Sequence, residues 1–294
     1  MDIRILRYFL AIARSENITK AANTLHIAQP SLSKQLMELE DELGTKLLIR
    51  GKRKISLTED GIFLSKRAEE IISLLEKTEH EITSDQENIC GDISIGSGET
   101  EAMDIVLQAT SSLSQKYPEI HYHLFSGDAT DVMERLDQGV LDFGILIEPV
   151  DTLKYDSIHL PVTDTWGILM AEDSPLALKE CLLPEDLVDL PLIIPQRSGL
   201  QRDFSLWIGT DLQRLNIIAT YNLGFNAAMP VKQGLGYALT LDKLIYTGAG
   251  SGLAFRSLAP EMKAQLSLVW KRYQIFSKAS EQFLNAVQTM ISFD

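Results

Sequence analysis

Apolar side chains recur every three or four residues in three successive segments of the first 44 positions. This spacing gives each segment one apolar face, which is typical of an amphipathic helix packed against a core. Asn17 is a suitable N-cap for the second segment, Pro30 suits the first turn of the third, and Gly44 suits its C-terminus. The pattern therefore predicts a helix-turn-helix. Its apolar positions are Leu6, Phe9, Leu10 and Ala13, then Ile18, Ala21, Ala22 and Leu25, then Leu32, Leu36, Leu39 and Leu43.

The third predicted helix carries a short polar face opposite its leucines. A face of this kind lets the first turn of a recognition helix approach base edges, while backbone amides meet phosphates. Glutamine can pair with adenine through two hydrogen bonds, and serine and lysine donate to bases or phosphates. An ordinary solvated helix face is the alternative. On this reasoning we expect DNA contacts from Gln29, Pro30, Ser31, Ser33 and Lys34.

Two short β-like runs follow the helix-turn-helix, at residues 46–50 and 54–58, around a turn that contains Gly51. They predict a hairpin with a basic tip. Most charged turns are simply solvated, but a basic hairpin directly after a helix-turn-helix indicates a wing that contacts phosphates or the minor groove. The cations of this wing are Arg50, Lys52, Arg53 and Lys54.

A long helix is predicted from Thr58 to about Asn88, because no proline interrupts this stretch and apolar positions alternate at spacings of four and three. A helix of about 28 residues is roughly 42 Å long. Its own small domain cannot cover that length, so a second copy of the chain is the natural partner, and packing on its own chain is the alternative. The expected dimerisation seam is Leu64, Ala68, Ile71, Leu75, Thr78 and Ile82.

From Gly91 onward, short apolar runs alternate with segments of helical period. This order predicts two α/β lobes built from parallel strands and right-handed crossovers, with a last strand and helix near the C-terminus. Ligands of such sheets bind at the carboxyl ends of the strands, beside helix N-termini. The expected effector-binding residues are Ser97, Gly98, Thr100, Asp128, Thr130, Arg197, Ser198, Asn222 and Asn226, with Gly127, Gln196 and Gly224 beside them.

These hydroxyls and amides, together with one arginine, indicate a small polar effector. Arg197 favours an anionic group on that effector, whereas Asp128 favours an amine, as in an amino acid. The sequence leaves both alternatives open. Each hydroxyl is equally suited to an ordinary helix cap.

The net charge of −14 argues against DNA binding only until the chain is divided. Residues 1–60 hold ten Lys and Arg against eight Asp and Glu, a net charge of +2, and the remainder carries −16. The acidity therefore belongs to the second part of the chain and leaves the predicted DNA-binding segment slightly basic.

Enzyme signatures are weak or missing in the sequence. His121 and His123 share one strand face without a nearby carboxylate or cysteine at metal spacing, and no nucleophile elbow, lysine phosphate loop or full dinucleotide motif occurs. We therefore expect neither an enzyme nor a cofactor. Two cysteines, Cys90 and Cys181, fit a reducing cytoplasm, and the chain shows no signal peptide and no run of 18 apolar residues for a membrane span.

Several motifs resemble the N-terminal domain of LysR-type transcriptional regulators. They are LRYFLAIA, Ala21-Ala22 with Leu25, QPSLS at 29–33, Leu39-Glu40, ELGTKLLIR and LTEDG. Where that family often has further basic residues after position 34, this chain has Met37 and Glu38. The motifs LDQGVLDFGI and VKQGLGYAL, with the order of elements after residue 90, resemble the family's effector domain, which is similar to type 2 periplasmic binding proteins.

The resemblance implies a sequence-specific transcriptional regulator controlled by a small-molecule co-inducer that shifts the closure of the two lobes. It implies operator DNA, further copies of the chain as homodimer and homotetramer, and RNA polymerase as partners. A solute-binding protein or an α/β enzyme with an added dimerisation segment is the rival, which the wing and the absence of an export signal disfavour. The implied domains are a winged helix-turn-helix at 1–60, a linker helix at 61–89 and an effector domain at 90–294, with lobe I at 90–161 and 266–294 and lobe II at 162–265.

Overall fold

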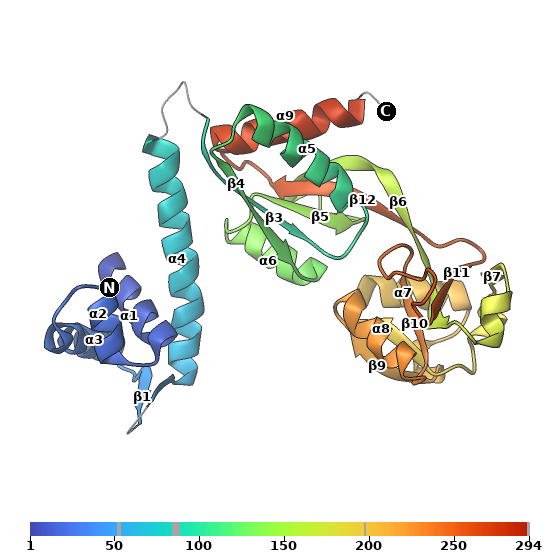
Figure 1. Cartoon of the computed structure of the whole chain (residues 1–294), viewed down its shortest axis with the longest axis horizontal. Coiled ribbons are helices and arrows are strands. Elements are labelled where there is room, and N and C mark those ends of the chain that lie inside the picture. Colours follow the sequence, from blue (N-terminus) through green and yellow to red (C-terminus); the bar gives the residue numbers. More distant parts are fainter. Residues whose placement is uncertain (52–53, 84–88, 197, 293–294) are drawn as a thin grey trace. The chain divides into compact units, whose positions relative to one another are not determined.

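A computed structural model describes residues 1–51, 54–83, 89–196 and 198–292 (Figure 1). The chain divides into two compact units, Met1–Thr83 and Ser84–Asp294. The first unit is mainly helical, and the second combines helices with a large sheet, so the predicted fold class is confirmed. None of the helices in the described ranges is long and apolar enough to cross a membrane.

Three helices and a hairpin form the N-terminal part of the first unit, as the apolar spacing predicts. The Asn17 side chain accepts the Lys20 amide at 2.9 Å, and Gly44 ends the third helix with a φ of 69°. Leu32, Leu36 and Leu39 are buried on the inner face of that helix. The elements are α1 (Ile3–Ser15), α2 (Ile18–Thr24), α3 (Gln29–Leu43), β1 (Leu48–Arg50) and β2 (Ile55–Leu57), the two strands being antiparallel.

Helix α4 (Glu59–Thr83) begins where its N-cap was expected, since the Thr58 hydroxyl accepts the Gly61 amide at 3.0 Å. It packs on α1 of its own unit, which corrects the predicted seam. Ala68 is completely buried in the core that α1 and α3 share, and Leu64 packs against that core. Ala68 therefore cannot contact a second copy, because its own chain covers this part of the helix. The Ile82 side chain lies outside what the structure describes.

Lobe I of the second unit is a twisted sheet with helices on both faces, and its strands run in the order β4-β3-β5-β12. Helices α5 and α9 share the larger apolar core with β3 and β5, and α6 packs on the other face (Figure 1). The elements are β3 (Gly91–Ser97), α5 (Met103–Lys116), β4 (Ile120–Ser126), α6 (Ala129–Asp137), β5 (Phe143–Ile147), β12 (Lys263–Lys271) and α9 (Lys278–Ser292).

Lobe II has a second sheet with parallel strands β10-β8-β9 and two helices, α7 and α8, over separate apolar clusters. Its elements are β7 (Cys181–Leu182), β8 (Leu192–Pro195), α7 (Ser198–Ile208), β9 (Ile217–Tyr221), α8 (Gly224–Lys232), β10 (Tyr237–Leu241) and β11 (Leu253–Leu258), with short 3₁₀ turns at Pro175–Leu178, Pro184–Asp186 and Leu212–Arg214.

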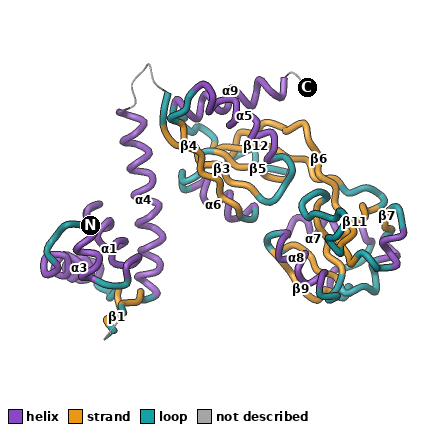
Figure 2. The backbone as a smooth tube through the Cα atoms, in the orientation of Figure 1, coloured by secondary structure: helices purple, strands orange, loops and turns teal. Residues whose placement is uncertain are grey.

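Two long strands connect the lobes. Strand β6 (Tyr155–Ala171) pairs with β12 in lobe I and with β10 and β11 in lobe II, so both strands pass through the crossover (Figure 2). A shift of register between Gln265 and Ser267 marks the bend in β12. The apolar run of the sequence marks only Trp166–Met170 of β6, and no such run marks β7 or β11. Polar residues and Pro161 break the apolar run of β6 before Trp166, and this hides its first half.

Candidate functional site

The N-terminus of α3 presents the polar side chains that the sequence predicted for DNA contact. Gln29, Pro30, Ser31 and Lys34 are exposed and Ser33 is half-buried. The Gln29 amide donates to the Ser33 hydroxyl at 2.9 Å. The N-cap residue of this helix forms no side-chain hydrogen bond to it, and the first turn holds no acidic residue. The positive end of the helix dipole therefore stays available to an anion such as a phosphate.

Lys34 is the cation of this surface, but it is not alone there. Its ammonium lies 3.7 Å from the Glu38 carboxylate one turn later, and both side chains are exposed. This exposed pair contributes little to stability, yet it reduces the positive potential that the recognition helix offers to DNA.

The second strand of the wing contacts the C-terminus of α1. Lys54 Nζ lies 2.7 Å from Glu16 Oε2, and the Ile55 amide donates to the Glu16 carbonyl at 3.0 Å. Lys52 and Arg53, and the side chain of Arg50, lie outside what the structure describes. Lys20 on α2 is exposed and has no ion pair within the described ranges. In a helix-turn-helix the helix before the recognition helix, here α2, crosses the DNA backbone. Lys20 is therefore a candidate for phosphate contact that the prediction missed.

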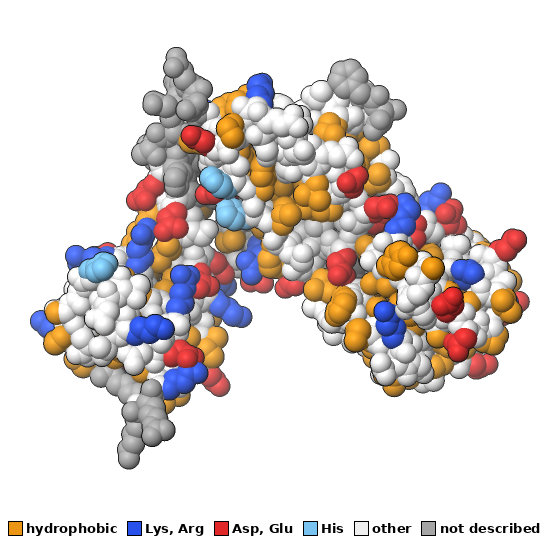
Figure 3. Space-filling view, in the orientation of Figure 1, with side chains coloured by type: hydrophobic (Ala, Val, Ile, Leu, Met, Phe, Trp, Pro, Cys, Tyr) orange, Lys and Arg blue, Asp and Glu red, His pale blue; other side chains and the backbone are white. Residues whose placement is uncertain are grey.

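On the face of this unit that Figure 3 shows, the cations and carboxylates of the described residues are interspersed. Arg7 pairs with Glu76 at 3.1 Å and Arg14 with Glu69 at 3.3 Å, so these two arginines of α1 contact carboxylates of α4. The net charge of +2 in residues 1–60 thus exaggerates the charge that is free to meet DNA.

A buried carboxylate joins the recognition helix to the wing. Glu40 is 4% exposed, and its Oε1 accepts the amides of Leu47 at 2.9 Å and Leu48 at 3.3 Å. Its Oε2 accepts Lys46 Nζ at 3.0 Å. Burial on its own raises the pKa of Glu40, but these hydrogen bonds outweigh it and hold the pKa below the ordinary 4.5. The ionised carboxylate therefore fixes the start of β1 against α3.

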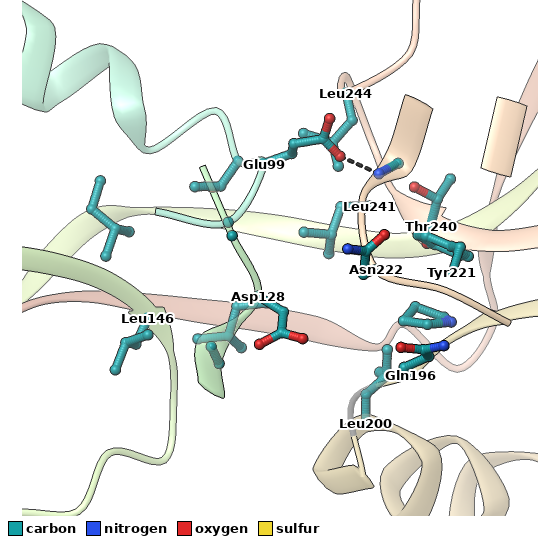
Figure 4. A pocket seen from close by; sticks show the side chains of 18 of the residues that line it. Glu99, Asp128, Leu146, Gln196, Leu200, Tyr221, Asn222, Thr240, Leu241 and Leu244 are labelled. Atoms are coloured by element: carbon teal, nitrogen blue, oxygen red, sulfur yellow. Dashed lines mark hydrogen bonds between the residues drawn. The ribbon is translucent and has the colours of Figure 1, made fainter. Parts of the chain in front are cut away.

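The second unit contains a cavity of about 110 Å³ at the carboxyl ends of its strands (Figure 4). Loops after β3 and β4 line it from lobe I, and loops after β8 and β9 and the end of β10 line it from lobe II. Much of the wall is apolar, with Leu146, Trp166, Leu200 and Leu241 among the side chains that form it. A small organic molecule with an apolar body fits such a wall.

Several predicted effector-binding residues meet at this cavity, and others do not. Gly98, Thr100, Asp128 and Asn222 line it, as do Gly127, Gln196 and Gly224. The Ser97 hydroxyl instead donates to the neighbouring Gly98 carbonyl at 2.6 Å, Thr130 is exposed, and the Asn226 amide donates to Asn222 at 3.4 Å. These three lie beside the cavity without lining it. Arg197 and the side chain of Ser198 lie outside what the structure describes.

Asp128 has a structural role in addition to its place in the cavity wall. It caps α6 and accepts the amides of Thr130 at 2.8 Å and Asp131 at 3.0 Å, while the Asp131 side chain accepts the Asp128 amide. This reciprocal capping box occupies one carboxylate oxygen of Asp128. Asp128 therefore serves as a helix cap, which was the alternative to the effector role.

The loop after β3 contacts lobe II at three successive residues. Glu99 accepts the backbone amide of Gly224, Thr100 donates to Asp164 at 2.5 Å, and Glu101 pairs with Lys243. Burial raises the pKa of Asp164, and the negative charges of Asp242 and Glu101 add to this against the Thr100 hydrogen bond. The loop after β3 thus joins lobe I to lobe II through side chains of three successive residues.

Sequence reasoning missed Glu99 among the residues of the cavity. It also missed the apolar wall and the hydroxyls of Tyr221 and Thr240. Glu99 was accessible to the rule that selected Gly98 and Thr100, because it stands between them directly after a strand. Of the weak histidine pair, His123 lies 3.1 Å from Asp92 Oδ1, and no cluster of metal-ligating side chains occurs in the described part of the chain.

A winged helix-turn-helix joined to a two-lobed α/β unit with a cavity between the lobes defines a class, the DNA-binding transcriptional regulators that carry a ligand-binding domain. Comparisons with known proteins identify the family. Residues 3–62 match the model for the bacterial regulatory helix-turn-helix protein of the lysR family, and residues 86–291 match the LysR substrate binding domain. The chain belongs to the LysR family of transcriptional regulators, as its motifs predicted.

Relatives and solved structures agree with this assignment. The HTH-type transcriptional regulator BsdA of Bacillus subtilis (strain 168) is 30% identical over 197 residues, which cover 66% of this chain and 67% of the relative. The Hca operon transcriptional activator HcaR of Escherichia coli (strain K12) is 27% identical and covers 99% of both chains. The crystal structure of CbnR, a LysR family transcriptional regulator, is similar in fold over 99% of both chains, with a TM-score of 0.75 at 17% identity.

Proposed function

We propose that this regulator recognises a specific operator through the N-terminus of α3, with the wing on the adjacent phosphates or minor groove. The observation that carries this is the exposed polar first turn of α3, which has no capping side chain or acidic residue to compete with DNA. Gln29, Ser31, Ser33 and Lys34 supply the donors. A solved complex of CbnR with its target DNA has a TM-score of 0.72 to this chain, which supports the comparison at the level of the fold.

Salt titration of duplex binding tests the recognition surface. For Lys34→Ala we expect about tenfold weaker binding and a salt slope smaller by about one for each protomer bound, because a phosphate contact is lost. Glu38→Gln removes the carboxylate that lies 3.7 Å from Lys34 and is expected to strengthen binding several-fold. Fluorescence anisotropy on operator and scrambled duplexes measures both. If neither substitution changes affinity or slope while Ser33→Ala is also silent, α3 is not the reading element.

We further propose that a small organic effector in the cavity controls the regulator. Its binding changes the closure of the two lobes and so the arrangement of the DNA-binding units in the assembled protein, which alters contact with RNA polymerase. The support is the cavity at the strand ends, where the loop after β3 already joins lobe I to lobe II. We place this activity in the cytoplasm and expect no cofactor and no catalysis.

A homodimer formed through α4, with further assembly to a homotetramer, is the proposed state on DNA. The apolar surface that α4 leaves open differs from the predicted seam in part, since α1 covers Ala68 whereas Ile71 stays exposed. Phe63 is 65% exposed, Leu74 48% and Ile71 40%. A second helix along this face would bury these side chains, and two linked DNA-binding units raise the effective concentration of the second at its half-site.

Leu74→Glu is expected to convert the purified protein to smaller assemblies and to weaken operator binding by about a hundredfold, because the avidity of two linked units is lost. Size-exclusion chromatography with light scattering measures the mass, and anisotropy measures the affinity. Leu206→Glu, at a 72% exposed position of α7, is the matched control and should leave both unchanged. An unchanged mass for Leu74→Glu would remove this face from the dimer.

A further inference from the structure

A carboxylate of the protein itself occupies an anion-attracting position of the cavity, the N-terminus of α8. Glu99 extends from the loop after β3 in lobe I, and its Oε2 accepts the backbone amide of Gly224, the first residue of α8 in lobe II (Figure 4). The N-cap of α8, Leu223, forms no side-chain hydrogen bond to the helix, and its first turn holds no acidic residue. Glu99 therefore supplies, from the other lobe, the negative charge that α8 lacks.

The local sequence makes room for this contact. A Cβ atom at Gly224 would lie 2.9 Å from Glu99 Oε2, so a glycine allows the carboxylate to approach the helix. Thr100, the next residue of the loop, is tied to the buried Asp164, and Glu101 pairs with Lys243. These contacts attach the residues that follow Glu99 to lobe II.

The remaining cavity contains a second feature that points to a ligand. The Thr240 hydroxyl lines the cavity, its residue is 1% exposed, and it makes no hydrogen bond of ordinary geometry to the described residues. The neighbouring Tyr221 hydroxyl gives its proton to the Leu239 carbonyl at 2.7 Å. The Tyr221 oxygen is the nearby acceptor for Thr240, and a ligand group in the cavity can offer the Thr240 hydroxyl a hydrogen bond of better geometry.

The described part of the cavity wall carries negative charge. Glu99 and Asp128 both line it, and no lysine or arginine belongs to the lining within residues 89–196 and 198–292. A carboxylate effector would have to displace Glu99 from α8 or lie close to these like charges. A hydroxyl or an ammonium group on an apolar body meets no such penalty.

We propose that Glu99 is an internal ligand of the effector cavity and its specificity-determining residue. By holding the N-terminus of α8, it excludes carboxylate effectors and directs the cavity to apolar molecules that carry an uncharged or cationic hydrogen-bonding group. This inference rests on the proposed effector role of the cavity. It also predicts that removing the Glu99 carboxylate opens a site for a free small carboxylate at α8.

Chemical rescue with acetate tests the proposal on the full-length protein. Sodium acetate at tens of millimolar, against sodium chloride at equal ionic strength, is expected to raise the Tm of Glu99→Ala by about 3 °C and to leave the wild type unchanged. Glu101→Ala removes the exposed carboxylate two residues away and is the matched control, which acetate should not stabilise. Differential scanning fluorimetry measures all three.

Glu99→Gln keeps the size of the side chain if the alanine variant does not fold. Its neutral amide is displaced more easily than a carboxylate, so it should gain a smaller acetate-dependent rise in Tm that Glu101→Gln lacks. The proposal is overturned if acetate stabilises neither Glu99 variant, or stabilises the wild type or the Glu101 variants equally. The thermal measurement contains no DNA. A failure of operator binding in a separate titration would therefore contradict the proposed DNA-binding function without changing the result for Glu99.

Discussion

Replacing Glu40 with alanine is expected to lower the free energy of unfolding of the first unit by about 3 kcal/mol and to abolish measurable operator binding. The substitution leaves the buried amides of Leu47 and Leu48 without their acceptor and releases Lys46. The start of β1 then loses its attachment to α3. A recognition helix and a wing that no longer hold a fixed relation cannot contact one duplex together.

The unfolding of the first unit can be measured separately, because all three tryptophans, Trp166, Trp207 and Trp270, lie in the second unit. Far-UV circular dichroism reports both units, whereas tryptophan fluorescence reports the second. In urea, the Glu40→Ala chain should therefore lose helical signal before its fluorescence changes. Asp41→Ala, which removes an exposed neighbouring carboxylate, should change stability by less than about 0.5 kcal/mol. Coincident, unshifted transitions in Glu40→Ala would contradict the prediction.

Because the pKa of Glu40 is lowered, its contribution to the free energy of unfolding is expected to depend on pH. A carboxylate whose pKa is below its ordinary 4.5 in the folded protein stabilises the fold fully above that value. The stabilisation is lost as the pH falls through the folded pKa. Compared with Glu40→Gln, the wild type should hold a constant advantage from pH 6 to 8, and that advantage should shrink below pH 4.5. A constant difference at all pH values would exclude ionisation as its source.

Gly61→Ala is expected to be comparably damaging, by at least about 3 kcal/mol, for a steric reason. A Cβ at this position would lie 2.1 Å from the Leu47 carbonyl oxygen and 3.3 Å from the Leu57 Cβ. The carbonyl cannot easily move, because it accepts the Thr58 amide at 3.0 Å. The first turn of α4 would have to shift away from the wing, and the junction between the hairpin and the long helix would open.

Gly199→Ala is the matched control for that substitution. Gly199 also lies in the first turn of a helix, α7, but a Cβ there meets nothing within 4 Å. Alanine at this position should be neutral or stabilising by a few tenths of a kcal/mol, because it restricts the unfolded chain. Thermal unfolding followed by circular dichroism compares the two variants. If both behave alike, the close approach of Gly61 to Leu47 does not matter for stability.

The sequence shows that Glu40 and Gly61 belong to family motifs, but it does not show which contacts they make. Glutamate at position 40 follows a buried leucine on an amphipathic helix and resembles any solvated residue. Its burial depends on the return of the chain at Leu47 and Leu48, after the helix has ended.

For the dimerisation seam the periodic pattern was clear, but the surface predicted from it was partly wrong, because α1 covers Ala68. The spacing of Leu64, Ala68 and Ile71 is the same whether a second copy or α1 of the same chain covers the helix. Burial of Ala68 against α1 decides the matter for the first half of α4, and the exposed Leu74 is left for the second. Periodicity identifies an apolar face but not the element that covers it.

By itself, the sequence determined the winged helix-turn-helix, the long helix, the two α/β lobes and the family, because these depend on local period, capping residues and short motifs. Only the tertiary structure decided that Lys54 is already paired with Glu16, that Glu40 joins α3 to the wing, and that Glu99 reaches across to α8. Glu16 and Lys54 are 38 residues apart in the chain, and Glu99 and Gly224 are 125 apart. Contacts over such separations arise from packing between elements, and no local pattern of side chains records them.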